Sequence, residues 1–190
     1  MEKLHADAIH SAAILRPACI TGMSHVLYEE YQLGVLGING KPRSAQDELM
    51  FVATVSDNER GAGVLLYENF LEDAAKQLGG DFFVIPASRH EVVLVRKDAD
   101  VSLEELKDLI KVSNMLQMPR EEQLTDSIYH YDSKNHIFEL ADKFEGRQKQ
   151  ELEAAKTSVL KGLKEKQVEV GSRVTGTKES VQKTRGGEVL

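Results

Sequence analysis

The 190-residue chain contains no tryptophan, a single cysteine and few aromatic residues, 6% in all. Proteins that stack many bases or sugar rings carry more aromatic side chains than this. Because the one cysteine has no partner in the chain, an intrachain disulfide and a cysteine-rich zinc site are both excluded. Cys19 stands between Ala18 and Ile20, and we expect it to be a small apolar residue of the core.

Long apolar runs are missing as well. The longest, such as residues 50–55 and 63–67, are far shorter than the roughly 20 residues that span a bilayer. The first seven residues alternate charged, polar and apolar side chains, so they contain no signal-peptide core. We therefore expect no membrane association and a location in the bacterial cytoplasm.

The charge of the chain is unevenly distributed. The net charge is −7; residues 1–140 hold 13 Lys and Arg against 23 Asp and Glu, a net of −10. Residues 141–190 hold 11 against 8, a net of +3. An acidic main domain repels a phosphate backbone, so no direct nucleic-acid binding is expected. A partner with a basic surface suits this domain better.

Hydrophobic periodicity and turn residues predict a mixed order of helices and strands. A helix over residues 4–16 should end at Pro17, and Ser24 should cap a second helix. Residues 50–55 and 63–67 are predicted to form a hairpin. Further strands are predicted over 81–85 and 91–96, and a last hairpin over 127–131 and 136–140, with its turn at 132–135.

Two segments show the spacing of a capping box at a helix start. Asn69 and Glu72 mark the start of one amphipathic helix, which Gly79-Gly80 should end. Ser102 and Glu105 mark the start of another. The order of elements predicts an α+β fold, with a largely antiparallel sheet and helices packed on one face. We expect one domain over residues 1–141, a C-terminal helix over 142–166 and a flexible, disordered tail over 167–190.

The corner between the two central strands is the segment that best suits a binding site. Ser88, Arg89, His90 and Glu91 place a hydroxyl, a guanidinium, an imidazole and a carboxylate on one loop between rigid strands. Ser and His side chains can pair as nucleophile and base, but catalytic triads are usually assembled from distant segments. The alternative is a structural corner, in which Ser88 and Glu91 bond loop amides and His90 is partly buried.

The sequence predicts neither a metal site nor a cofactor. No two histidines have the helical spacing of a zinc site, and His130 and His136 are expected at solvated positions of the last hairpin. The Gly61-Ala62-Gly63 and Gly79-Gly80 segments lack the spacing of a phosphate-binding loop. No catalytic residues are assigned.

Several segments together resemble an uncharacterised bacterial family, catalogued as domain of unknown function 5688 and common in anaerobic gut bacteria. The matching corner contains Ser88, His90 and Glu91, whereas Ala87 replaces the first serine of the family's Pro-Ser-Ser-x-His-Glu pattern. The resemblance implies that the chain corresponds to the C-terminal part of longer members, as a truncated or split version, and it supplies no activity. The other matching segments are residues 4–18, 61–67, 78–86, 104–106, 112–114 and 124–132.

These observations favour a non-enzymatic interaction or accessory protein, and they leave the oligomeric state open. The C-terminal helix carries a thin apolar stripe that includes Leu152 and Ala155, which could dock on the parent domain or bind a protein partner. The alternative function is a small-molecule binder or hydrolase that uses the corner at Ser88-Arg89-His90-Glu91.

Overall fold

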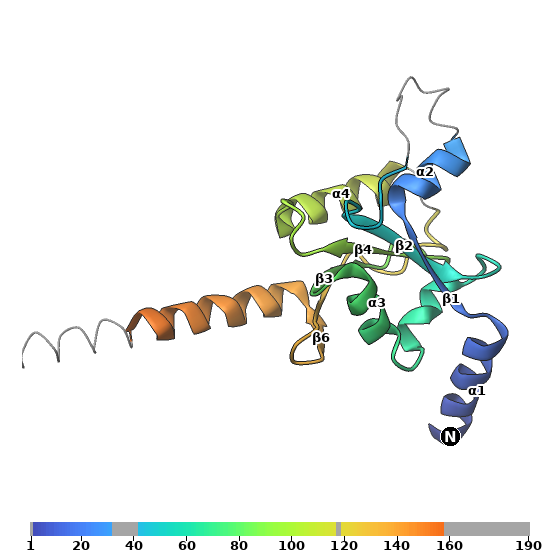
Figure 1. The fold of residues 1–190 in the computed structure, drawn as a ribbon, viewed down its shortest axis with the longest axis horizontal. Coiled ribbons are helices and arrows are strands. Elements are labelled where there is room, and N and C mark those ends of the chain that lie inside the picture. The colour runs from blue at the N-terminus through green and yellow to red at the C-terminus, as the bar shows by residue number, and fades with distance from the viewer. Residues whose placement is uncertain (1, 32–41, 117–118, 158–190) are drawn as a thin grey trace, which may run out of the picture. The chain divides into compact units, whose positions relative to one another are not determined.

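The computed structural model describes residues 2–31, 42–116 and 119–157 and contains a six-stranded antiparallel sheet (Figure 1). The strand order across the sheet is β1-β2-β4-β3-β5-β6, and every neighbouring pair is antiparallel. The elements in chain order are α1 (Glu2–Leu15), β1 (Ala18–Gly22), α2 (Met23–Tyr31), β2 (Met50–Val55), the 3-10 helix η1 (Gly61–Leu66), α3 (Phe70–Leu78), β3 (Phe82–Ile85), β4 (Val92–Arg96), α4 (Leu103–Leu116), β5 (Tyr129–Asp132) and β6 (Ile137–Leu140).

The chain divides into two compact units, Met1–Phe144 and Glu145–Leu190. Residues 141–157 are helical, and the predicted C-terminal helix is therefore present in its first part. The rest of that predicted helix and the predicted tail over 167–190 lie outside the described residues. The predicted domain limit at residue 141 stays a prediction.

The α+β class and the antiparallel sheet are confirmed, but the placement of the helices on one face is wrong. Phe82 and Val84 of β3 pack in one core with α3 and η1, while Phe83 and Ile85 pack in a second core with α4. Successive side chains of a strand point to opposite faces, so a strand that is apolar at every position is buried on both. Residues 82–85 and 92–95 are apolar at every position, so the sequence already indicated strands that are buried on both faces.

The helix ends follow some local signals and not others. Helix α1 ends at Leu15, just before Pro17, as predicted, whereas Ser24, the predicted cap of a second helix, lies within the first turn of α2. The capping box of α4 forms: Ser102 N donates to Glu105 Oε2 at 2.8 Å, and Glu105 N donates to Ser102 Oγ at 3.3 Å. Gly79 ends α3 with a φ of 87°, a conformation that costs glycine little. Asn69 precedes α3 but makes no side-chain capping bond, because its own backbone is left-handed, with a φ of 61°.

One strand prediction and one burial prediction are also wrong. Residues 63–66 of the expected strand lie in η1, in which Val64 is fully buried, and Tyr67 follows its end. The Ala62 amide donates to Arg89 O at 3.3 Å, so this segment packs on the corner instead of extending β2 into a hairpin. Cys19 is exposed, because it lies on β1, an edge strand that the sequence analysis did not predict.

Candidate functional site

The predicted corner between β3 and β4 is held by its own hydrogen bonds. Ser88 is buried, and its Oγ accepts a bond from the His90 amide at 3.0 Å. The Ser88 amide donates to Glu91 O at 3.2 Å, which closes the turn. Among the described residues, no hydrogen bond joins Ser88 Oγ to the His90 ring, so the two side chains are not arranged as nucleophile and base.

The His90 ring bonds to neighbouring segments through both nitrogens. Arg89 Nε donates to Nε2 at 3.0 Å, and Nδ1 lies 3.3 Å from Asn58 O and 3.3 Å from the Arg60 amide. The neutral tautomer with hydrogen on Nδ1 satisfies Asn58 O and Arg89 together. The other tautomer would accept from the Arg60 amide but would turn an N–H toward the Arg89 donor. In either form the His90 ring is a hydrogen-bonded part of the corner.

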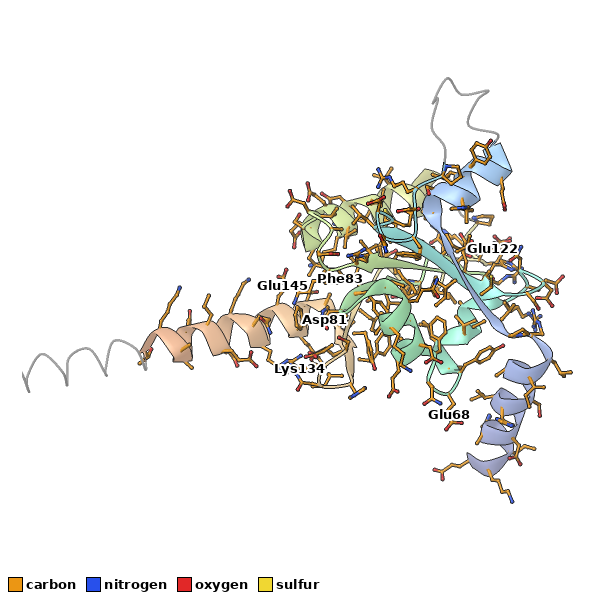
Figure 2. All side chains as sticks on the ribbon, viewed as in Figure 1. Glu68, Asp81, Phe83, Glu122, Lys134 and Glu145 are labelled. Atoms are coloured by element: carbon orange, nitrogen blue, oxygen red, sulfur yellow. The ribbon has the colours of Figure 1, made fainter. Side chains whose placement is uncertain are left out.

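Three further segments anchor the corner. The Arg89 amide donates to Glu122 O at 2.9 Å, and the Arg89 guanidinium lies 3.9 Å from the Glu122 carboxylate, a residue labelled in Figure 2. Thr54 Oγ1 donates to His90 O at 2.8 Å, and Gly61 lies against both of these atoms. The four predicted site residues are thus neighbours in a tightly bonded turn that joins β2, η1 and the 119–122 loop.

A second cluster, which the sequence analysis missed, surrounds His130 on β5. This side chain is fully buried, whereas a solvated position was predicted for it. Within the part of the chain that the structure describes, neither of its ring nitrogens has a hydrogen-bond partner, and Nε2 lies 3.9 Å from Asp81 Oδ2. Burial and the nearby Lys97 charge together lower the pKa of His130 to about 4, against the opposing effect of Asp81. His136 is exposed, as predicted, and lies 3.3 Å from Glu72 Oε1.

A shallow hollow of about 430 Å³ lies beside this cluster, next to the end of α3. Asp81, Arg96, Lys97 and Asp98 line it together with Gly79 and Gly80, and Figure 2 shows Asp81 beside α3. Arg96 is paired with Asp98, and Asp81 accepts bonds from the Ser133 amide and hydroxyl at 2.9 and 2.7 Å. These charges compensate one another within the chain, so the hollow has no excess charge to attract an ion.

Helix α1 presents an unusual surface, because none of its residues is buried. Leu4, Ala8, Ser11 and Leu15 are all exposed, and their spacing places them on one side of the helix. On another side, α1 and the segment after η1 enclose a hollow of about 470 Å³, which we name the α1 groove. Its lining includes Ile9, Ala13 and Ile14 of α1 together with Leu66, Glu68 and Asn69, and Figure 2 labels Glu68.

The sequence match to known families covers most of the chain. A family described as a family of unknown function, DUF5688, matches residues 1–133, which is more than half of the chain. The chain belongs to DUF5688. No curated protein and no solved structure matches it.

The DUF5688 match covers α1, the corner and His130, and it ends before Phe144, whose ring lies on the His130 imidazole. It lies in the N-terminal part of this chain and leaves out the helix beyond residue 141. Among the residues described for this DUF5688 chain, no group of three His, Cys, Asp or Glu side chains could hold a metal ion. In the same residues, no helix is long and apolar enough to cross a membrane.

Proposed function

We propose that this chain is a non-enzymatic interaction or accessory protein that binds a protein partner at the α1 groove. The observation that carries the proposal is that a helix of 14 residues, rich in leucine, isoleucine and alanine, has no buried residue. Ile14 and Leu66, which line the groove, are each 68% exposed. Apolar side chains that gather at a hollow and remain exposed are typical of a protein-binding surface.

The chemistry of the groove supports an amphipathic helix as its occupant. The apolar lining suits side chains at helical spacing from a partner, which is a common mode of helix-in-groove recognition. Glu68 lies at the groove, and residues 1–140 carry a net charge of −10. A partner helix with basic residues beside its apolar face would be attracted, whereas a second copy of this acidic unit would be repelled.

The helix beyond residue 141 is a second proposed contact for a protein partner. Leu152 is 56% exposed, and its neighbour Ala155 is exposed as well. We further propose a bacterial cytoplasmic location, a source among gut anaerobes and no direct nucleic-acid binding. The small-molecule binder or hydrolase at Ser88–Glu91 stays the alternative, although internal bonds occupy Ser88 and His90.

A site-specific crosslinking experiment tests the α1 groove. A photo-crosslinking amino acid at position 14 of the full chain, expressed in its native cells, should capture a partner through a basic amphipathic helix. The affinity of that purified partner is then measured for wild type, Leu66→Glu and Leu109→Glu. We expect Leu66→Glu to weaken binding by about tenfold or more, as at an interface hot spot.

Leu109→Glu is the matched control, since it adds the same charge at another exposed leucine, on α4 and outside both proposed contacts. Both leucines are exposed, so both variants should fold with nearly unchanged stability. Equal binding by wild type and Leu66→Glu would contradict the proposal. Capture of a second copy of this chain in place of a basic partner would contradict it too.

A further inference from the structure

A buried carboxylate lies beside the junction of β1 and α2, far along the chain from the corner. Glu48 is only 4% exposed. Its Oε2 atom accepts hydrogen bonds from the Ser24 amide, at 3.1 Å, and from the Ser24 hydroxyl. Helix α2 begins at Met23, so the Ser24 amide is one of the first-turn donors that have no acceptor within the helix. The positive end of α2 therefore holds one oxygen of this carboxylate in place.

Gly22 makes room for the carboxylate. A Cβ atom at this position would lie 2.8 Å from Glu48 Oε2, closer than real Cβ contacts, and 3.0 Å from Glu48 Cγ. A side chain at residue 22 would therefore displace the carboxylate from its present position. Together with the two bonds from Ser24, the missing side chain favours this position of the carboxylate.

The second carboxylate oxygen is available to a ligand. Among the described residues, both bonds to Glu48 go to Oε2, and none goes to Oε1. Glu48 also lines a pocket of about 240 Å³, whose apolar part is formed by Ile20 and Phe51. This volume is below the range of about 300–1,000 Å³ that is usual for drug-sized ligands. The ligand should therefore be about the size of a single amino acid.

Two cationic or polar side chains lie at the same pocket. Arg43 and His25 both belong to its lining, and both are exposed. Among the described residues, neither the Arg43 guanidinium nor the His25 ring forms a hydrogen bond or an ion pair; Arg43 uses only its backbone amide, which donates to Ser24 Oγ at 2.9 Å. A pocket with one buried carboxylate and one unpaired guanidinium is suited to a ligand with both charges.

We propose that this pocket binds a free α-amino acid with a small apolar side chain. Its ammonium group would donate to Glu48 Oε1, and its carboxylate would accept from the Arg43 guanidinium. Its side chain would lie against Ile20 and Phe51. This site is independent of the α1 groove, so either proposal can fail alone.

Titration calorimetry and thermal shift on the full chain test the site with L-alanine and L-valine as probes. We expect either probe to raise the melting temperature of wild type. Arg43→Gln should weaken binding by about tenfold or more, because it removes one charged hydrogen-bond partner. Glu48→Gln should abolish binding while its amide oxygen still accepts from Ser24. Lys111→Gln, which removes an exposed charge on α4, is the matched control and should bind like wild type.

Methylamine carries only the positive charge of an amino acid, and acetate carries only the negative charge. If both Glu48 and Arg43 take part in binding, each fragment should bind far more weakly than L-alanine. Binding of either fragment as tight as that of L-alanine would overturn the assignment to an amino acid. Absence of any heat or melting shift at millimolar L-alanine and L-valine would overturn it as well. In the described residues the Arg43 side chain forms no hydrogen bond or ion pair, so Arg43→Gln keeps the test valid even if Glu48→Gln does not fold.

Discussion

The imidazole of His130 stacks on the ring of Phe144, with centroids 3.5 Å apart and 14° between the planes. Phe83 packs edge-on to the same imidazole at 5.4 Å, and Lys97 Nζ lies 4.2 Å from the centroid of the Phe144 ring. His130 is therefore enclosed between aromatic rings beneath a cation. Both its burial and the cation oppose protonation, so this histidine is neutral at pH 7.

The first prediction concerns acid stability. The pKa of His130 is about 4 in the folded chain against the ordinary 6.5, so the unfolded chain binds more protons between these values. Stability should then fall as the pH drops from about 6.5 to about 4, by on the order of 2–3 kcal/mol from this residue. Urea unfolding measured at steps of pH across this window checks the prediction.

The control for this prediction is His130→Phe, which keeps an aromatic ring and removes the titration. Carboxylates also titrate in this range, so the quantity to compare is the slope of stability against pH in the two proteins. We expect a shallower slope in the variant, whatever its absolute stability. Identical slopes would show that His130 does not carry the acid dependence, and His130→Leu repeats the comparison if the phenylalanine is too large.

The second prediction concerns the glycine beneath the corner. A Cβ atom at Gly61 would lie 2.0 Å from Thr54 Oγ1 and 2.3 Å from His90 O, and the second of these is backbone that cannot rotate away. Gly61→Ala should cost about 2–3 kcal/mol of stability, as overpacking does. Gly63→Ala is the matched control, since no atom lies within 4 Å of its added Cβ. Equal melting temperatures for the two variants would refute this account of the corner.

The third prediction concerns the start of α4. Ser102→Ala removes the hydroxyl that accepts from the Glu105 amide and should lower stability by about 1 kcal/mol. Ser102→Thr keeps a hydroxyl at the cap and should retain most of the stability. Urea midpoints at an unchanged m-value measure both. A loss as large for threonine as for alanine would mean that the cap bond is not the cause.

The fourth prediction concerns His90. His90→Ala removes the side-chain bonds to Asn58 O and Arg89 Nε, and a loss of about 1 kcal/mol is expected. A thermal-shift screen of wild type and variant against metals, nucleotides, amino acids and sugars measures the loss and tests the alternative function. We expect the two proteins to respond alike to every ligand. A ligand that stabilises wild type alone would instead make the corner a binding site.

Local sequence signals predicted the elements whose stability depends on nearby residues. The α4 helix carries both its capping box, Ser102 and Glu105, and its buried stripe within one continuous segment. The stop of α3 at Gly79 depends only on a residue that adopts positive φ at little cost. Such features need no information from the rest of the chain.

The errors occurred where contacts between distant segments decide the outcome. Residues 63–67 have the composition of a strand, yet η1 forms because Gly61 and Ala62 pack against Thr54 and the corner. Likewise, Cys19 has an apolar setting in the sequence, but its strand pairs only with β2 and remains at the edge of the sheet. No pattern within a short segment of the sequence predicts that η1 forms or that the strand with Cys19 lies at the edge.

In the candidate sites, too, chain order predicted some features and contacts between distant segments decided the others. The proximity of Ser88, Arg89, His90 and Glu91 followed from their order in the chain, whereas their bonding to Thr54, Asn58 and Glu122 did not. The pairing of His130 with Phe144 and of Glu48 with Ser24 joins residues on separate elements.

The sequence by itself determined the α+β class, the main helices, the central strands and the acidic character of the first 140 residues. These depend on periodicity, turn residues and charge, which are properties of short segments or of simple counts. Only the tertiary structure decided which faces of the sheet are covered, which histidine is buried and which carboxylate lines a pocket. Those outcomes depend on how strands far apart in the chain pair, because pairing decides which side chains lose contact with water.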